Sequence, residues 1–99
     1  MNAGRWPALD FARSQRTRLK TTKYFEFRRQ FPDRITIKNE WIQHVIRCPE
    51  KTERQSDGRI RMWARIEESE GRYLRIILLA DGETVHNAFF DRNFQGASS

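Results

Sequence analysis

The sequence predicts an α+β protein in which an antiparallel meander of three to four strands packs on one main helix. Two observations support this fold class. Residues 59–66 alternate strictly between two kinds of side chain, which is the period of a half-buried strand. Asn39 to Cys48 instead carries apolar residues at helical spacing, and the following Pro49 ends the helix.

Two turns define the expected register of the sheet. Asp81-Gly82 is a two-residue hairpin signal, and it pairs Ile77 with His86. For the loop between the two earlier strands, the register considered is the one that leaves Ile66 opposite Arg72. Both hairpins then agree on a core face made of Ile60, Met62, Ala64, Leu74, Ile76, Leu78, Val85 and Phe89. The opposite face collects Arg61, Trp63, Arg65, Tyr73, Arg75, Ile77, His86, Ala88 and Phe90.

The rest of the chain is expected to divide into an arm, a domain and a tail. Residues 1–22 are predicted to form a basic N-terminal arm that is helical in part. Residues 23–94 form the single α+β domain, and residues 95–99 a frayed tail. Within the domain, Lys23 to Arg29 is expected to be a short strand or extended segment, and residues 53–55 to open another strand.

The charge of the chain is unevenly distributed. With 99 residues, the chain is long enough for one modest core. The net charge is +6, and residues 1–34 hold nine Lys or Arg against three acidic residues. Such a segment attracts polyanions through counterion release, although a solubilising tail has the same composition. An isoelectric point near 10.2 favours nucleic acid or an acidic partner protein.

Several classes of protein are not expected. No apolar run approaches about 18 residues, so no membrane span is predicted. Residues 1–20 lack the apolar stretch of a secretory signal, and Cys48 is the single cysteine, which fits a reducing cytoplasm. The chain has neither the Cys and His spacing of a zinc site nor a phosphate-binding glycine loop. We therefore expect no metal and no cofactor.

The predicted polar face carries the residue types that metal-free RNA cleavage needs. An acid and a base must move protons, and cations must stabilise charge on the phosphorane. A histidine titrates near neutrality, guanidinium groups match phosphate oxygens, and aromatic rings stack on bases. The catalytic candidates are His86, Arg75 and Arg65. The substrate-binding candidates are Arg61, Trp63 and Tyr73.

The same residues also have structural interpretations. His86 can be a hydrogen-bonded structural histidine, and the arginines can form exposed ion pairs with the nearby acidic residues. Trp63 belongs to the core if a helix covers its face. A second hypothesis is therefore a non-catalytic RNA- or protein-binding module that uses the same arginine and aromatic face.

The order and spacing of short motifs resemble a known family. The motifs are Cys48-Pro49-Glu50, Asp57-Gly58, the strand 59–66, and residues 73–77 before Asp81-Gly82. Over residues 35–94 they resemble a family of small bacterial proteins whose fold is similar to the RelE and BrnT toxins, within the barnase–colicin–RelE group of ribonucleases.

This resemblance implies a RelE-like sheet and a toxin-like, metal-independent ribonuclease that acts on RNA and pairs with a small antitoxin protein. Arg75 matches the arginine on the central strand of the family. Residues 84–92 depart from the RelE pattern, in which a late Tyr or His near an Arg does the chemistry.

Overall fold

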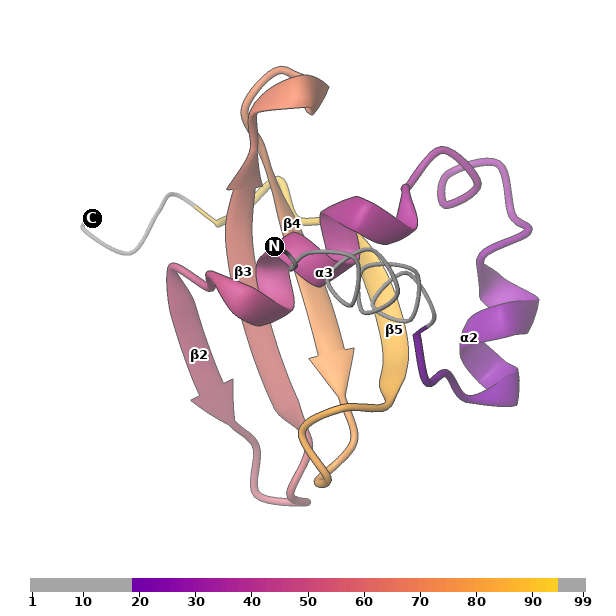
Figure 1. The fold of residues 1–99 in the computed structure, drawn as a ribbon, viewed down its shortest axis with the longest axis vertical. Coiled ribbons are helices and arrows are strands. Elements are labelled where there is room, and N and C mark those ends of the chain that lie inside the picture. The colour runs from indigo at the N-terminus through magenta and orange to yellow at the C-terminus, as the bar shows by residue number, and fades with distance from the viewer. Residues whose placement is uncertain (1–18, 95–99) are drawn as a thin grey trace, which may run out of the picture.

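A computed structural model describes residues 19–94 of the chain (Figure 1). The elements are α2 (Lys23–Arg28), α3 (Asn39–Arg47), β2 (Lys51–Arg54), β3 (Ile60–Ile66), the 3-10 turn η1 (Glu67–Ser69), β4 (Arg72–Leu78) and β5 (Val85–Phe90). The strands form one antiparallel sheet in the order β2-β3-β4-β5. The α+β meander is confirmed, whereas most of the predicted arm and the tail lie outside the described residues.

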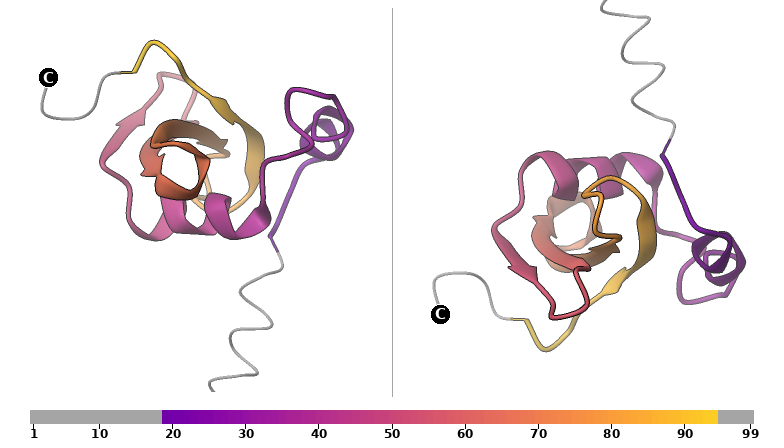
Figure 2. Two further views of the ribbon diagram at one scale, coloured as in Figure 1. Left: turned by 90° about the horizontal axis from the view of Figure 1, so that it is seen from above. Right: turned by 90° about the horizontal axis from the view of Figure 1, so that it is seen from below.

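The helix α3 covers one face of this sheet, as the apolar stripe predicted. Trp41, Ile42 and Val45 are buried, and α3 contacts β3 and β4 (Figure 2). Ile42 and Val45 join the inward side chains of the strands in one hydrophobic core. Each such aliphatic side chain contributes about 2 kcal/mol on burial. The Trp41 indole N–H also donates to the Glu68 carboxylate of η1 at 2.7 Å, which ties α3 to the loop between β3 and β4.

The register predicted for β3 and β4 is confirmed. Ile66 lies opposite Arg72, and Trp63 lies opposite Arg75. The alternation places Ala64, Ile66, Leu74 and Ile76 in the core with α3. The odd-numbered residues of both strands therefore face away from α3, which defines the outer face of the sheet.

The register predicted for β4 and β5 is wrong for every pair after Leu78 and Val85. Leu78 does pair with Val85, but Ile77 pairs with Asn87, so His86 is an extra residue in β5. A bulge of this kind moves every later side chain to the other face. Ala88 is consequently buried in the core, and Phe89 lies opposite Arg75 on the outer face. The prediction had these two residues the other way round.

The turn between β4 and β5 is also wider than predicted. The Leu79 N–H donates to the Thr84 carbonyl at 2.9 Å, so the loop spans more than Asp81 and Gly82. The Asp81 carboxylate accepts from the backbone N–H groups of Glu83 and Thr84 and from the Thr84 hydroxyl. These three bonds lower the pKa of Asp81 to about 2.

The segment after Thr22 forms the helix α2 and not the expected extended segment. The Thr22 hydroxyl accepts from the Phe25 N–H at 3.0 Å and caps the helix. Phe25 is buried in the core, and α2 contacts β5 beyond the edge of the sheet (Figure 2). The chain before α2 is also tied to β5, because the Val85 N–H donates to the Lys20 carbonyl at 2.8 Å. Within the described residues, neither helix has the length and apolar character needed to cross a membrane.

Candidate binding site on the outer face of the sheet

Guanidinium groups and aromatic rings alternate across the outer face. The Arg75 guanidinium carbon lies 5.6 Å from the centre of the Trp63 ring and 5.1 Å from that of Phe89. Arg61 extends the row over Trp63 at 5.9 Å, and Arg34 extends it over Phe89 at 5.3 Å. We call these five residues the arginine–aromatic stack. Each cation–π contact contributes about 0.5–1 kcal/mol at such sites, and together they hold the guanidinium groups in place.

Trp63 is the covered centre of this stack. Only 5% of its surface is exposed, and its indole N–H donates to the Asp91 carboxylate at 3.0 Å. Phe94 stacks on its ring with centres 5.0 Å apart and 9° between the planes. A ring that is enclosed in this way cannot stack on a base of RNA. Trp63 therefore has a structural role, in which it packs against the arginines of the site. Phe94, which follows β5, covers this ring, whereas the expected cover was a helix.

The arginines of the stack are partly neutralised by carboxylates. Arg61 lies 3.3 Å from Glu53, and Arg34 lies 3.2 Å from Asp33. The Arg75 contact to Asp91 is longer, at 3.7 Å. The Nε atoms of Arg61 and Arg75 are nevertheless buried without a hydrogen-bond partner among the described residues. The carboxylates therefore do not satisfy every donor of these two side chains.

A groove of about 450 Å³ opens beside the stack, where β5 ends. Its lining residues are Asp33, Arg34, Arg72, Tyr73, Phe89, Phe90, Asp91, Arg92 and Phe94. Two guanidinium groups lie over aromatic rings in this lining, because Arg72 covers Phe90 at 4.0 Å just as Arg34 covers Phe89. The groove thus combines cations with aromatic rings in one concave surface.

Most residues of the groove were not predicted from the sequence. Arg34 comes from the turn after α2, far from the strands in sequence, and no local pattern brings it to β5. Phe89 was assigned to the core because the bulge was not predicted. The Phe31-Pro32-Asp33 turn marked a break in the chain, but it carried no signal that Arg34 would reach the outer face.

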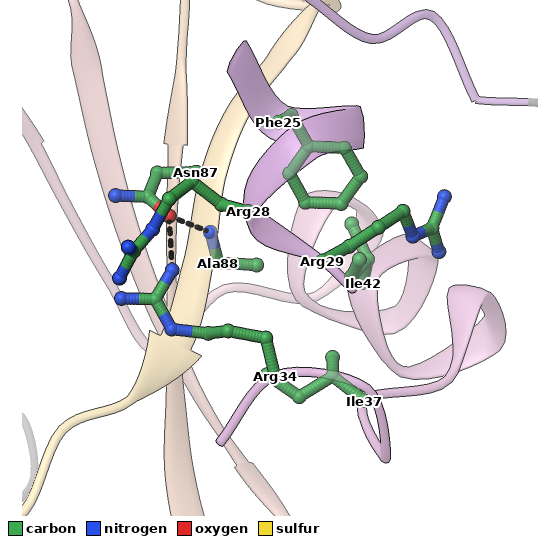
Figure 3. A pocket seen from close by; sticks show the side chains of 8 residues that line it. All are labelled: Phe25, Arg28, Arg29, Arg34, Ile37, Ile42, Asn87 and Ala88. Carbon is green, nitrogen blue, oxygen red and sulfur yellow. Dashed lines mark hydrogen bonds between the residues drawn. The ribbon is translucent and has the colours of Figure 1, made fainter. Parts of the chain in front are cut away.

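An amide holds Arg34 in this position. The Asn87 side-chain oxygen accepts from the Arg34 Nη1 atom at 2.8 Å and from the Ala88 N–H at 2.9 Å (Figure 3). Arg28 of α2 lines the same small pocket, and its Nε atom is buried without a partner among the described residues. Two arginines from the segment before α3 therefore converge on the edge of β5.

His86 does not lie with Arg65 and Arg75, the two arginines predicted to share a catalytic site with it. Its ring stacks on Tyr24 of α2 with centres 4.9 Å apart, and its Nδ1 atom is 3.1 Å from the Thr22 hydroxyl. Desolvation lowers the pKa of His86, and the nearby Arg59 charge lowers it further. The bulge turns this histidine toward α2, so the predicted constellation of His86 with Arg65 and Arg75 does not assemble.

The remaining candidates lie at the borders of the site. Arg65 is 51% exposed and pairs with Glu67 at 3.0 Å, outside the arginine–aromatic stack. Tyr73 lines the groove, with its ring edge-on to Phe94 at 5.0 Å. The structure therefore brings Arg61, Trp63 and Arg75 together and places Tyr73 beside them.

Residues 19–94 contain no group of three or more His, Cys, Asp or Glu side chains that could hold a metal ion. Comparison of the chain with protein-family models, with curated proteins and with solved structures finds no match. The resemblance to RelE-like toxins therefore stays a prediction.

Proposed function

We propose that this chain is an RNA-binding protein that holds single-stranded RNA in the groove at the end of β5. The observation behind the proposal is that three arginines, Arg34, Arg72 and Arg92, line one groove with four aromatic residues. Single strands are bound by positively charged grooves in which aromatic rings stack on bases, and guanidinium groups match phosphate oxygens.

The charge around the groove supports an anionic ligand. Residues 19–38 hold six Lys or Arg against two acidic residues, a net charge of +4. This segment includes Arg28 and Arg34, which reach the β5 edge beside the groove. A polyanion that enters the groove therefore meets further positive charge along its path.

The geometry favours binding over cleavage. A general base must come within hydrogen-bond reach of the hydroxyl that it deprotonates. His86 instead contacts Thr22 and Tyr24, and it does not line the groove. Ribonuclease activity and control by an antitoxin stay predictions from the family resemblance, and the binding experiment includes a measurement of cleavage.

The test is a titration of fluorescently labelled oligouridylate of about ten nucleotides, followed by anisotropy at several salt concentrations. We expect Arg92→Ala and Arg72→Ala each to weaken binding roughly three- to tenfold, and each to reduce the salt slope by about 1. Arg47→Ala is the matched control, because it removes an equal charge from the exposed end of α3.

The outcomes separate the alternatives. An equal loss in all three variants would indicate non-specific attraction to a basic protein, and no binding by the wild type would refute the proposal. Gel analysis of the same samples shows whether the RNA is cut. If the wild type cuts the RNA and His86→Ala does not, the protein is a ribonuclease and the proposal of binding without cleavage is wrong.

A further inference from the structure

The exposed large hydrophobic side chains of the described chain all lie in one short segment. Tyr24 is 45% exposed, Phe27 60% and Ile35 65%, and no other large hydrophobic residue in residues 19–94 is as open to solvent. Scattered exposed apolar residues are ordinary, but their concentration within residues 24–35 is not. This segment is α2 and the turn that follows it.

Three aromatic residues of this segment follow helical spacing. Tyr24, Phe27 and Phe31 lie at positions i, i+3 and i+7, and the Phe31 N–H donates to the Arg28 carbonyl at 3.1 Å, which extends the helical path. The rings of Phe27 and Phe31 meet edge to face, with centres 5.1 Å apart. We call these three residues the α2 stripe.

The fold does not need the α2 stripe for its own stability. Phe25 already anchors α2, because it is 3% exposed and belongs to the core. The Thr22 cap and the bonds of residues 20 and 22 to Val85 hold the start of the helix. The stripe is therefore an apolar surface left available for a partner.

The surface around the stripe is positively charged. Residues 19–38 carry a net charge of +4. The single acidic residue of α2, Glu26, is already engaged, because it accepts from the Thr21 hydroxyl at 2.7 Å and lies 3.4 Å from Arg29. An apolar stripe in a positive surround complements a ligand that is both acidic and apolar.

We propose that the α2 stripe docks an acidic segment of a second protein, which inserts apolar side chains against Phe27 and Phe31. The chain itself cannot supply this segment. Residues 1–18 carry four Lys or Arg against one acidic residue, and residues 19–38 of a second copy would bring another +4. The positive charge around the stripe would repel both segments, so the occupant is a different protein.

The side chains favour a protein over RNA at this surface. A base stacks on an open ring, but His86 covers one face of Tyr24, and Phe27 and Phe31 pack against each other. Ile35 offers no ring at all. Aromatic residues bordered by arginine are instead typical of the few residues that dominate protein–protein binding.

The experiment uses the full isotope-labelled chain and three probes followed by NMR. Two are synthetic amphipathic peptides with the same Leu and Trp residues, one with glutamates and one with lysines on the polar face. The third is the oligouridylate that tests the groove. We expect the glutamate peptide alone to shift the signals of Tyr24, Phe27 and Phe31.

Phe27→Ala should weaken binding of the glutamate peptide at least about tenfold, as truncation of a dominant contact residue does. Since Phe27 is 60% exposed, the spectrum of this variant should show an intact fold. Thr52→Ala, an exposed change in β2, is the matched control and should leave the affinity unchanged. Phe27→Leu, which keeps an apolar side chain, should restore part of the affinity.

Two results would overturn the proposal. If the glutamate and lysine peptides bind equally well, or if neither binds, the proposed acidic partner is refuted. Shifts of the stripe caused by oligouridylate and lost in Phe27→Ala would assign the stripe to RNA.

Discussion

The two faces of the sheet are covered in different ways. α3 closes the inner face with aliphatic side chains, and Leu74, Ile76 and Leu78 are completely buried there. Within residues 19–94 no helix covers the outer face, where stacked arginines and rings and Phe94 enclose Trp63. One face thus supplies apolar burial, while the other holds arginines whose buried Nε atoms have no hydrogen-bond partner among the described residues.

The largest expected effect comes from truncating a residue of the inner face. Leu74→Ala should lower the free energy of unfolding by about 2–5 kcal/mol, because it leaves a cavity in a rigid core. Arg75→Ala, the next residue on the same strand, is the matched outer-face change and should cost about 1 kcal/mol. Urea unfolding measures both. Equal losses would mean that the two faces do not differ in the way we describe.

A smaller effect should come from the hydrogen bond below the stack. Trp63→Phe keeps an aromatic ring but removes the indole N–H that donates to Asp91. We expect a loss of about 1–2 kcal/mol, because the partly buried Asp91 carboxylate then keeps only its bond from the Asn93 N–H and the longer contact to Arg75. Thermal unfolding monitors the change. Unaltered stability would show that water replaces the indole and that the outer face is more open than described.

Removal of the N-cap of α2 should lower the free energy of unfolding by a still smaller amount. Thr22→Ala removes the hydroxyl that accepts from Phe25 and that lies beside His86. The expected loss is about 1 kcal/mol, and Thr22→Ser should restore most of it because serine caps equally well. Hydrogen exchange of the α2 amides, compared with those of α3, reports the effect. Protection that falls equally in both helices would contradict a local role.

The smallest expected effect is the pH dependence due to His86. Its pKa in the folded protein is lowered from 6.5, so between that lowered pKa and about 6.5 the unfolded chain binds more protons. Stability should therefore fall as the pH drops through about 6.5 and stay constant just above it. His86→Gln should flatten this slope in unfolding curves. A slope that persists in the variant would belong to another group.

Local patterns sufficed where neighbouring residues decide the structure. The alternation of residues 59–66 and the loop after them predicted the pairing of β3 with β4, since a strand of period 2 has one register that buries its apolar face. The same holds for α3, whose stripe and following Pro49 defined both its buried side and its end. Hence the shared face of Arg61, Trp63 and Arg75 could be predicted.

Contacts between distant segments decided the rest. The bulge at His86 lies where residues 20–22 and α2 reach β5, and no pattern within residues 84–90 announces these partners. The candidate site changed with it, because Phe89 moved outward and His86 turned toward Tyr24. Arg34 joined the site through its bond to Asn87, 53 residues later in the chain.

The sequence by itself determined the strand alternation, the main helix, the meander order and the basic N-terminal third, because periodicity, turn residues and charge are local properties. Only the tertiary structure decided which arginines and rings share a groove and which aromatic residues stay exposed on α2. The physical reason is that one inserted residue in β5 exchanges the two faces of the strand after it, and the residues that pack against β5 at this point come from residues 20–22 and α2, far away in the sequence.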